Sequence, residues 1–166
     1  RLQEDLIRIW QQRRKTIVFV THDIDEALKL GDKVAVFGRG GVLQQYDPPP
    51  RLLSNPANDF VAGFIGSPKM NFVTGELAKQ QGAATIGVRP EHLKVERDGQ
   101  GGWHGTVAVA EHLGSDTFLY VDAGPQGMLT ARYIGELDLH PGDKVSLIPD
   151  PARIHRFDDS GKSIHA

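Results

Sequence analysis

The chain of 166 residues contains no cysteine, so it has neither a disulfide scaffold nor a thiolate metal site, which fits the cytoplasm. No apolar run approaches the length needed to cross a bilayer, and the first residues show no signal-peptide pattern. Aromatic residues are sparse, and a net charge of −2 argues against a protein that neutralises nucleic-acid phosphates. What remains is a globular protein of one domain or two small ones.

The most informative stretch is Ile17-Val18-Phe19-Val20, whose composition predicts a short strand buried on both faces, as in parallel sheets. Thr21-His22-Asp23 follows, and a helical pattern begins at Ile24, with Asp23 as the expected cap. His22 would then stand at the carboxyl end of a buried strand, where open α/β sheets hold their ligands. On its own, such a histidine is more often structural than catalytic.

The pattern of residues 1–66 is that of an α/β domain. Residues 34–37 and 42–46 are predicted strands joined by a turn at residues 38–41, and Asp47-Pro48 and Asn55-Pro56 are predicted helix starts. Gly66 is expected to end the last helix in a left-handed conformation. Residues 1–10 are already helical in pattern, with no initiator methionine or capping residue before them. We therefore interpret the chain as a piece of a longer protein.

From Ser67 onward, short alternating runs separated by glycine-rich turns predict a small β-barrel or sandwich. The predicted strands cover residues 71–73, 85–89, 105–109, 117–121, 128–132, 144–148 and 153–157.

The segment Thr21-His22-Asp23-Ile24-Asp25-Glu26-Ala27, with the strands and turn after it, resembles the switch-histidine region of ATP-binding-cassette (ABC) transport ATPases. The resemblance implies that His22 hydrogen-bonds the γ-phosphate of ATP and the attacking water, in a Mg²⁺-containing site shared by two subunits. Asp23 is expected to cap the helix, and Glu26 to be a solvated charge. The sequence lacks the family's signature and Walker B motifs, and the phosphate-loop pattern Gly-x-x-x-x-Gly-Lys-Ser/Thr does not occur in it. The glycine-rich segment Gly38-Arg39-Gly40-Gly41 has no lysine and is best explained as a hairpin turn.

The second part is similar to the transport-associated OB-like (TOBE) domain of sugar importers of the maltose type. The similarity rests on four segments: Gly66-Ser67-Pro68-Lys69-Met70-Asn71-Phe72, Ile86-Gly87-Val88-Arg89-Pro90-Glu91-His92-Leu93, Glu111-His112-Leu113-Gly114-Ser115 and residues 149–157. The first part, with residues 23–27 and 55–60, looks more like ATPases of betaine and other osmoprotectant importers. The transported solute is therefore expected to be a sugar or related polyol, or else betaine.

We predict an α/β remnant of an ABC ATPase domain at residues 1–66, followed by an all-β OB-like (TOBE) barrel with a regulatory role at residues 67–166. The resemblance implies a full-length ATPase that acts with ATP and Mg²⁺ as a homodimer, peripheral at the cytoplasmic face of the membrane. Its partners would be membrane-spanning permease subunits and, indirectly, a solute-binding protein, with no role for nucleic acid. The 166 residues alone should be inactive and hold no cofactor.

An alternative is an OB-like module that binds an oxyanion such as molybdate in a nest of backbone amides, with no enzymatic role. The remaining histidines show no His-x-x-x-His pairing, so no metal site is expected at His92, His104, His112, His140, His155 or His165. Trp103, Phe118 and Tyr120 are expected to pack in the barrel. Arg13-Arg14-Lys15 is expected to mark a helix terminus rather than a nucleic-acid patch.

Overall fold

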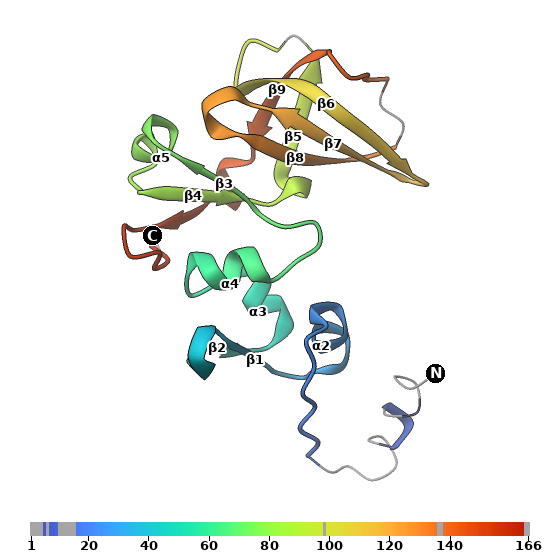
Figure 1. The fold of residues 1–166 in the computed structure, drawn as a ribbon, viewed down its shortest axis with the longest axis vertical. Coiled ribbons are helices and arrows are strands. Elements are labelled where there is room, and N and C mark those ends of the chain that lie inside the picture. Colours follow the sequence, from blue (N-terminus) through green and yellow to red (C-terminus); the bar gives the residue numbers. More distant parts are fainter. Residues whose placement is uncertain (1–4, 6, 10–15, 98, 136–137, 165–166) are drawn as a thin grey trace. The chain divides into compact units, whose positions relative to one another are not determined.

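The computed structural model describes residues 5, 7–9, 16–97, 99–135 and 138–164 (Figure 1). The chain divides into two compact units, Arg1–Ala57 and Asn58–Ala166. Within the described ranges, no helix is long and apolar enough to span a membrane. The domain boundary that the sequence pattern predicts after residue 66 stays a prediction.

The first unit is built around a β-hairpin. Strands β1 (Val34–Phe37) and β2 (Leu43–Asp47) pair antiparallel, between helices α2 (Ile24–Leu30) and α3 (Pro49–Ser54). The connecting turn is a short 3-10 helix, η1 (Arg39–Gly41), in which Gly40 and Gly41 have φ angles of 73° and 75°. These angles favour glycine, so the glycine-rich segment is the hairpin turn that the sequence predicted.

The strand predicted at residues 17–20 does not form, and this prediction is wrong for the chain. Residues 16–20 have no regular secondary structure, and Val18 and Val20 are 87% and 91% exposed. The run has the composition of a buried strand, but a strand needs a hydrogen-bonded neighbour, and the described part of this unit contains only the β1–β2 pair.

In the predicted helix of residues 1–10, the described residues 5 and 7–9 are helical. The predicted helix terminus at Arg13-Arg14-Lys15 lies outside the described residues.

Two predicted helix starts are displaced along the chain. Asp47 is the last residue of β2, so Pro48 takes the capping position of α3. Asn55 ends α3 instead of opening a helix, and α4 (Asp59–Phe64) starts after Asn58, whose side chain accepts the Val61 N–H at 2.9 Å. In both cases the residue that the sequence pattern assigned to a helix cap already belongs to the preceding element. Asp47 pairs in β2, and Asn55 ends α3.

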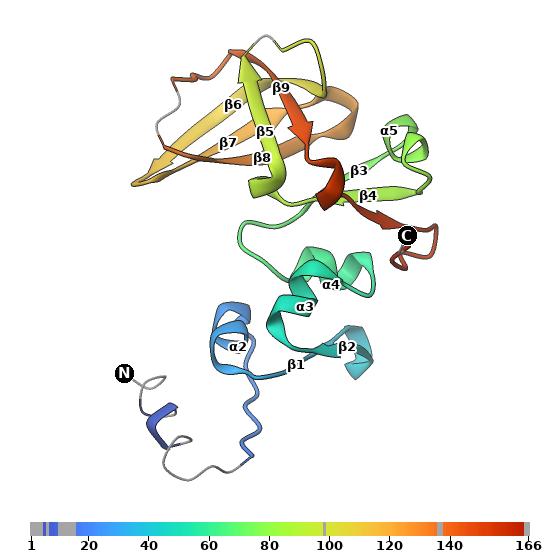
Figure 2. The same cartoon turned by 180° about the vertical axis from the view of Figure 1, so that it is seen from behind.

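The second unit contains two antiparallel sheets, and each strand expected from the sequence is present in them. One sheet has the order β10-β4-β3, and the other has the order β5-β9-β6-β7-β8. The edge strands β5 and β8 contact each other, so the larger sheet curls round its core (Figure 2). The strands are β3 (Asn71–Thr74), β4 (Thr85–Val88), β5 (Leu93–Arg97), β6 (Trp103–Leu113), β7 (Asp116–Asp122), β8 (Met128–Ile134), β9 (Lys144–Pro149) and β10 (His155–Phe157).

This architecture is an α/β segment followed by an OB-like β domain, as predicted. Strand β5 and helix α5 (Glu76–Gln80) were not expected from the sequence.

The core of the second unit lies on the concave side of the curled sheet. Leu119 and Val121 of β7 point into it, together with Trp103, as expected for that tryptophan. Phe118 and Tyr120 alternate with those core residues and are half-buried, outside the core cluster, so the expectation that they have a packing role stays a prediction. Side chains alternate across a strand, and the pleat assigns the aliphatic residues of β7 to the core.

Candidate functional site

His22 lies in the turn that leads into α2, and its neighbours hold that turn rigidly. The Asp23 carboxylate caps the helix by accepting the Glu26 N–H at 3.0 Å, as predicted. The Thr21 hydroxyl accepts the Asp23 N–H at 3.0 Å and donates to the Glu26 carboxylate at 3.2 Å. Glu26 is half-buried and takes part in a capping network, a contact that the expectation of a solvated charge did not include.

The imidazole of His22 itself is exposed, and nothing in the described part of the chain hydrogen-bonds to it. The backbone on either side of His22 is fixed by these hydrogen bonds. The position from which the side chain extends is therefore set, while the ring itself is exposed to solvent. A side chain placed this way can give one hydrogen bond to a phosphate oxygen or a water molecule. It cannot by itself bind a nucleotide, because phosphate cradles use several backbone amides and a lysine.

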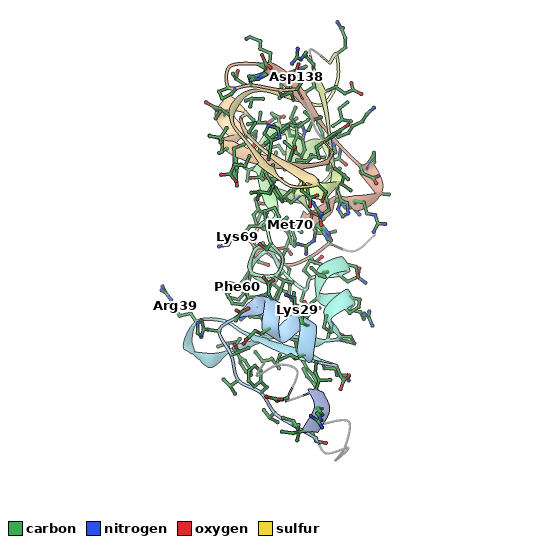
Figure 3. The ribbon with its side chains drawn as sticks, turned by 90° about the vertical axis from the view of Figure 1, so that its right-hand side faces the viewer. Lys29, Arg39, Phe60, Lys69, Met70 and Asp138 are labelled. Carbon is green, nitrogen blue, oxygen red and sulfur yellow. The ribbon has the colours of Figure 1, made fainter. Side chains whose placement is uncertain are left out.

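The hairpin turn has the glycines of a phosphate loop but not its geometry. It connects β1 to β2 and not a strand to a helix. Its one cation, Arg39, points away from the fold (Figure 3). The sequence also contains Gly161-Lys162-Ser163, but these residues form the turn and return strand of a C-terminal hairpin, where Ser163 pairs with Phe157. Neither segment supplies the strand–loop–helix arrangement that phosphate binding requires.

Two histidines of the β-rich unit are held in a defined tautomer. The Ser146 hydroxyl donates to the Gly99 carbonyl at 2.7 Å and contacts Nδ1 of His104 at 3.0 Å. A hydroxyl has one proton, so Nδ1 of His104 must be the donor in the second bond. His112 repeats the arrangement, since its Nδ1 contacts the Thr117 hydroxyl at 3.0 Å and that hydroxyl donates to the Gly135 carbonyl at 2.9 Å.

The remaining histidines do not gather into a site. Nδ1 of His92 is buried without a hydrogen-bond partner in the structure, and Nδ1 of His140 lies 3.7 Å from Asp138. His155 lies in strand β10, and His165 is outside the described residues. Among the residues that can be placed, no three His, Asp or Glu side chains come together as metal ligands.

An open hollow of about 460 Å³ lies on the outer face of the sheet where β6 and β9 pair. Lys144 and His104 are the basic side chains that line it, beside Thr106, Ser146 and Gly99. Lys144 is exposed, and the Ser146 hydroxyl is already committed to Gly99 and His104. The hollow therefore gives the oxyanion-binding alternative no specific support.

Comparison with known proteins matches residues 86–157 to the TOBE domain family. The sn-glycerol-3-phosphate import ATP-binding protein of Paracoccus denitrificans is 36% identical over 168 residues, covering 90% of this chain and 47% of that protein. The alpha-glucoside transport ATP-binding protein of Rhizobium meliloti is 35% identical and covers 91% of this chain and 49% of its own length. The trehalose/maltose import ATP-binding protein of Thermococcus litoralis is 32% identical, with 99% and 52% covered. The chain thus spans about half the length of the curated relatives it matches.

Proposed function

The chain belongs to the ATP-binding subunits of ABC importers that carry a TOBE domain, and from this premise we propose that it forms part of an ATPase that drives the uptake of a sugar or related polyol. The observation that carries the proposal is the match over nearly the whole chain to importer subunits named for glycerol 3-phosphate, alpha-glucosides and trehalose/maltose. Those names favour a sugar or polyol over betaine, the other solute that the sequence suggested.

We assign to His22 the role of the switch histidine in this ATPase. Its ring would donate a hydrogen bond to the γ-phosphate and hold the attacking water in line. Such a bond acts mainly in the transition state, where charge develops on the phosphate oxygens. The capping network of Thr21, Asp23 and Glu26 supports this role, because it fixes the backbone from which the ring extends.

The other parts of the ATP site are proposed to lie outside these 166 residues. They are the phosphate-binding loop, the carboxylates that handle Mg²⁺ and the signature motif of a second subunit. The working assembly would be a homodimer, bound at the cytoplasmic face of two membrane-spanning permease subunits that receive the solute from a solute-binding protein. No residue of this chain is assigned to Mg²⁺, and the chain alone should not hydrolyse ATP.

The test is ATP turnover by the complete subunit, reconstituted with its permease, with and without the substitution His22→Ala. We expect kcat to fall by roughly two to three powers of ten, the usual effect of losing one transition-state hydrogen bond, while nucleotide affinity changes little. His140→Ala is the matched control, because that ring is also exposed and belongs to the β-rich unit. A His22→Ala enzyme that keeps half of the normal turnover would show that His22 is structural.

A further inference from the structure

Helix α2 starts with a capping arrangement that differs from the usual one in the path of a single hydrogen bond. In a capping box, the glutamate at the third helical position accepts the N–H of the capping residue directly. Here Asp23 is the cap and Glu26 is the third helical residue, but the Asp23 N–H donates to the Thr21 hydroxyl at 3.0 Å. That hydroxyl in turn donates to the Glu26 carboxylate at 3.2 Å. Thr21 is thus inserted between the two partners of the box.

The inserted hydroxyl closes a hydrogen-bonded turn around His22. The turn runs from the Thr21 hydroxyl through the main chain to the Asp23 N–H, so it contains the φ and ψ bonds of His22. These two bonds set the direction in which the His22 side chain leaves the backbone. A direct capping box would begin at Asp23 and leave His22 outside it. The relayed form therefore fixes the backbone of His22 as well as the start of the helix.

Glu26 determines how the Thr21 hydroxyl is oriented. A hydroxyl has one proton and two lone pairs; here the proton is donated to Glu26, and a lone pair accepts the Asp23 N–H. Without the carboxylate, the Thr21 side chain would be free to take another rotamer and to donate its proton to water. The Glu26 carboxylate thus influences the backbone of His22 through Thr21.

Helix capping alone does not explain this relay. The Asp23 carboxylate already accepts the Glu26 N–H at 3.0 Å, which is the bond that a cap requires. Helix α4 starts with the same kind of cap at Asn58, and its third residue is Val61, which has no carboxylate. What the relay adds at α2 is control of the residue before the cap, and that residue is His22.

We propose that Thr21 and Glu26 are positioning residues of the ATPase reaction, which hold His22 in the direction that the γ-phosphate requires. This role rests on the proposed function of His22 as the switch histidine. A side chain that places one hydrogen bond on a transferring phosphate loses rate steeply when it is displaced, since a shift of about 1 Å can cost about a hundredfold. Neither Thr21 nor Glu26 is proposed to touch ATP or the attacking water.

ATP turnover by the complete subunit, reconstituted with its permease, tests Thr21 by removal and by rescue. Thr21→Val keeps the shape of the side chain but removes the hydroxyl, and we expect it to lower kcat by about tenfold with KM for ATP unchanged. Thr21→Ser keeps the hydroxyl and should stay within about twofold of wild type. Normal turnover by Thr21→Val, or an equal loss in both variants, would overturn the proposal.

Glu26 is tested against a neighbour of the same charge. Glu26→Ala should lower kcat by about the same factor as Thr21→Val, whereas Glu26→Gln, whose amide oxygen can still accept the proton, should recover turnover. Asp25→Ala is the matched control, because Asp25 is exposed in the same helical turn and its loss changes the charge there equally. Equal losses from Glu26→Ala and Asp25→Ala would show that the charge matters and not the hydrogen bond, and would contradict the proposal.

A double substitution separates a positioning role from a general effect on the fold. If Thr21 acts only through His22, the variant that combines Thr21→Val with His22→Ala should be as slow as His22→Ala and no slower. Effects that multiply would overturn the proposal. A slow His22→Ala with a normal Thr21→Val removes only the positioning role, whereas a normal His22→Ala removes the proposed function of His22 and the positioning role with it.

NMR relaxation of the 166-residue chain gives a readout that is independent of turnover. The backbone N–H order parameter of His22 should be about 0.85 in wild type and fall toward about 0.6 in Thr21→Val and in Glu26→Ala, but stay high in Asp25→Ala. If Thr21→Val folds poorly, Glu26→Ala still decides. An order parameter that neither Thr21→Val nor Glu26→Ala changes would show that the relay does not hold His22, and the proposal would fail.

Discussion

At the scale of single residues, the chain shows how a buried hydroxyl can choose the tautomer of a histidine. In His104 and His112 the hydroxyl proton is already used on a backbone carbonyl, so Nδ1 must carry the ring proton. Protonation of such a ring adds a proton at Nε2 and leaves the existing hydrogen bond intact.

This arrangement predicts a specific NMR signature. At a pH where the rings are neutral, long-range ¹⁵N–¹H spectra should show protonated Nδ1 and unprotonated Nε2 for His104 and His112. Ser146→Ala should release the constraint on His104 alone, and Thr117→Val that on His112 alone. His22, whose ring has no partner within the described structure, is the internal reference. Protonated Nε2 in the neutral form of both rings would refute the assignment.

At the scale of elements, a buried side-chain amide links the two sheets of the β-rich unit. Asn71, on β3, donates to the Thr130 carbonyl at 2.7 Å and accepts the Thr130 N–H at 2.7 Å, and it also donates to the Val88 carbonyl at 3.2 Å. The carboxamide thus copies the hydrogen-bond pair of a neighbouring strand on the edge of β8. Because Asn71 is buried, water cannot replace these bonds.

Asn71→Ala should therefore lower the free energy of unfolding by about 2–4 kcal/mol, the range for leaving several buried backbone groups unpaired. Urea unfolding followed by the fluorescence of buried Trp103 would measure the change.

A natural control is a second side-chain amide, which binds the backbone at the end of β3. The side chain of Gln126 makes the same pair of bonds to Thr74, but these bonds are longer, at 3.2 and 3.3 Å, and exposed. Gln126→Ala should cost less than about 1 kcal/mol, since water can satisfy the released groups. Equal losses in the two variants would show that burial of the Asn71 bonds does not matter.

At the scale of the whole molecule, the two units differ in how completely they bury their apolar residues. The β-rich unit has a closed core of aliphatic side chains. In the first unit, by contrast, the run Ile17-Val18-Phe19-Val20 is exposed, as are Phe37, Leu43 and Tyr46 of the hairpin. Extended apolar segments with unpaired backbone groups are templates for pairing with another chain.

The chain should therefore self-associate through residues 17–20 at tens of micromolar, as measured by sedimentation velocity. Replacing Val18 and Val20 with lysine should shift it toward monomer. The control replaces Leu113 and Ile134 with lysine. These two residues are also exposed and apolar, but they lie where strands β6 and β8 end beside β7. A monomeric wild-type chain, or a dimer that only the control substitutions dissociate, would contradict this prediction.

Local patterns in the sequence were enough to predict the hairpin of the first unit, the Asp23 cap and each expected strand of the β-rich part. These features depend on neighbours in the chain: alternation of apolar residues, glycine at positive φ, and a carboxylate placed before a helix. The motifs around His22 and Arg89 also pointed to the correct family. Sequence alone could not say whether residues 17–20 would pair, because a strand is defined by a partner that lies elsewhere.

Tertiary structure decided the features that depend on distant residues. It showed that the side chain of Gln45 hydrogen-bonds the backbone just beyond α3, that the Gly161 carbonyl hydrogen-bonds the start of α4 and that Asn71 bridges two sheets, over sequence separations that no local pattern encodes. It also displaced the expected caps at Asp47 and Asn55, because a residue engaged in one element cannot open the next. The chemistry of each side chain can be read from the sequence, whereas the partner it meets is settled only when the chain has folded.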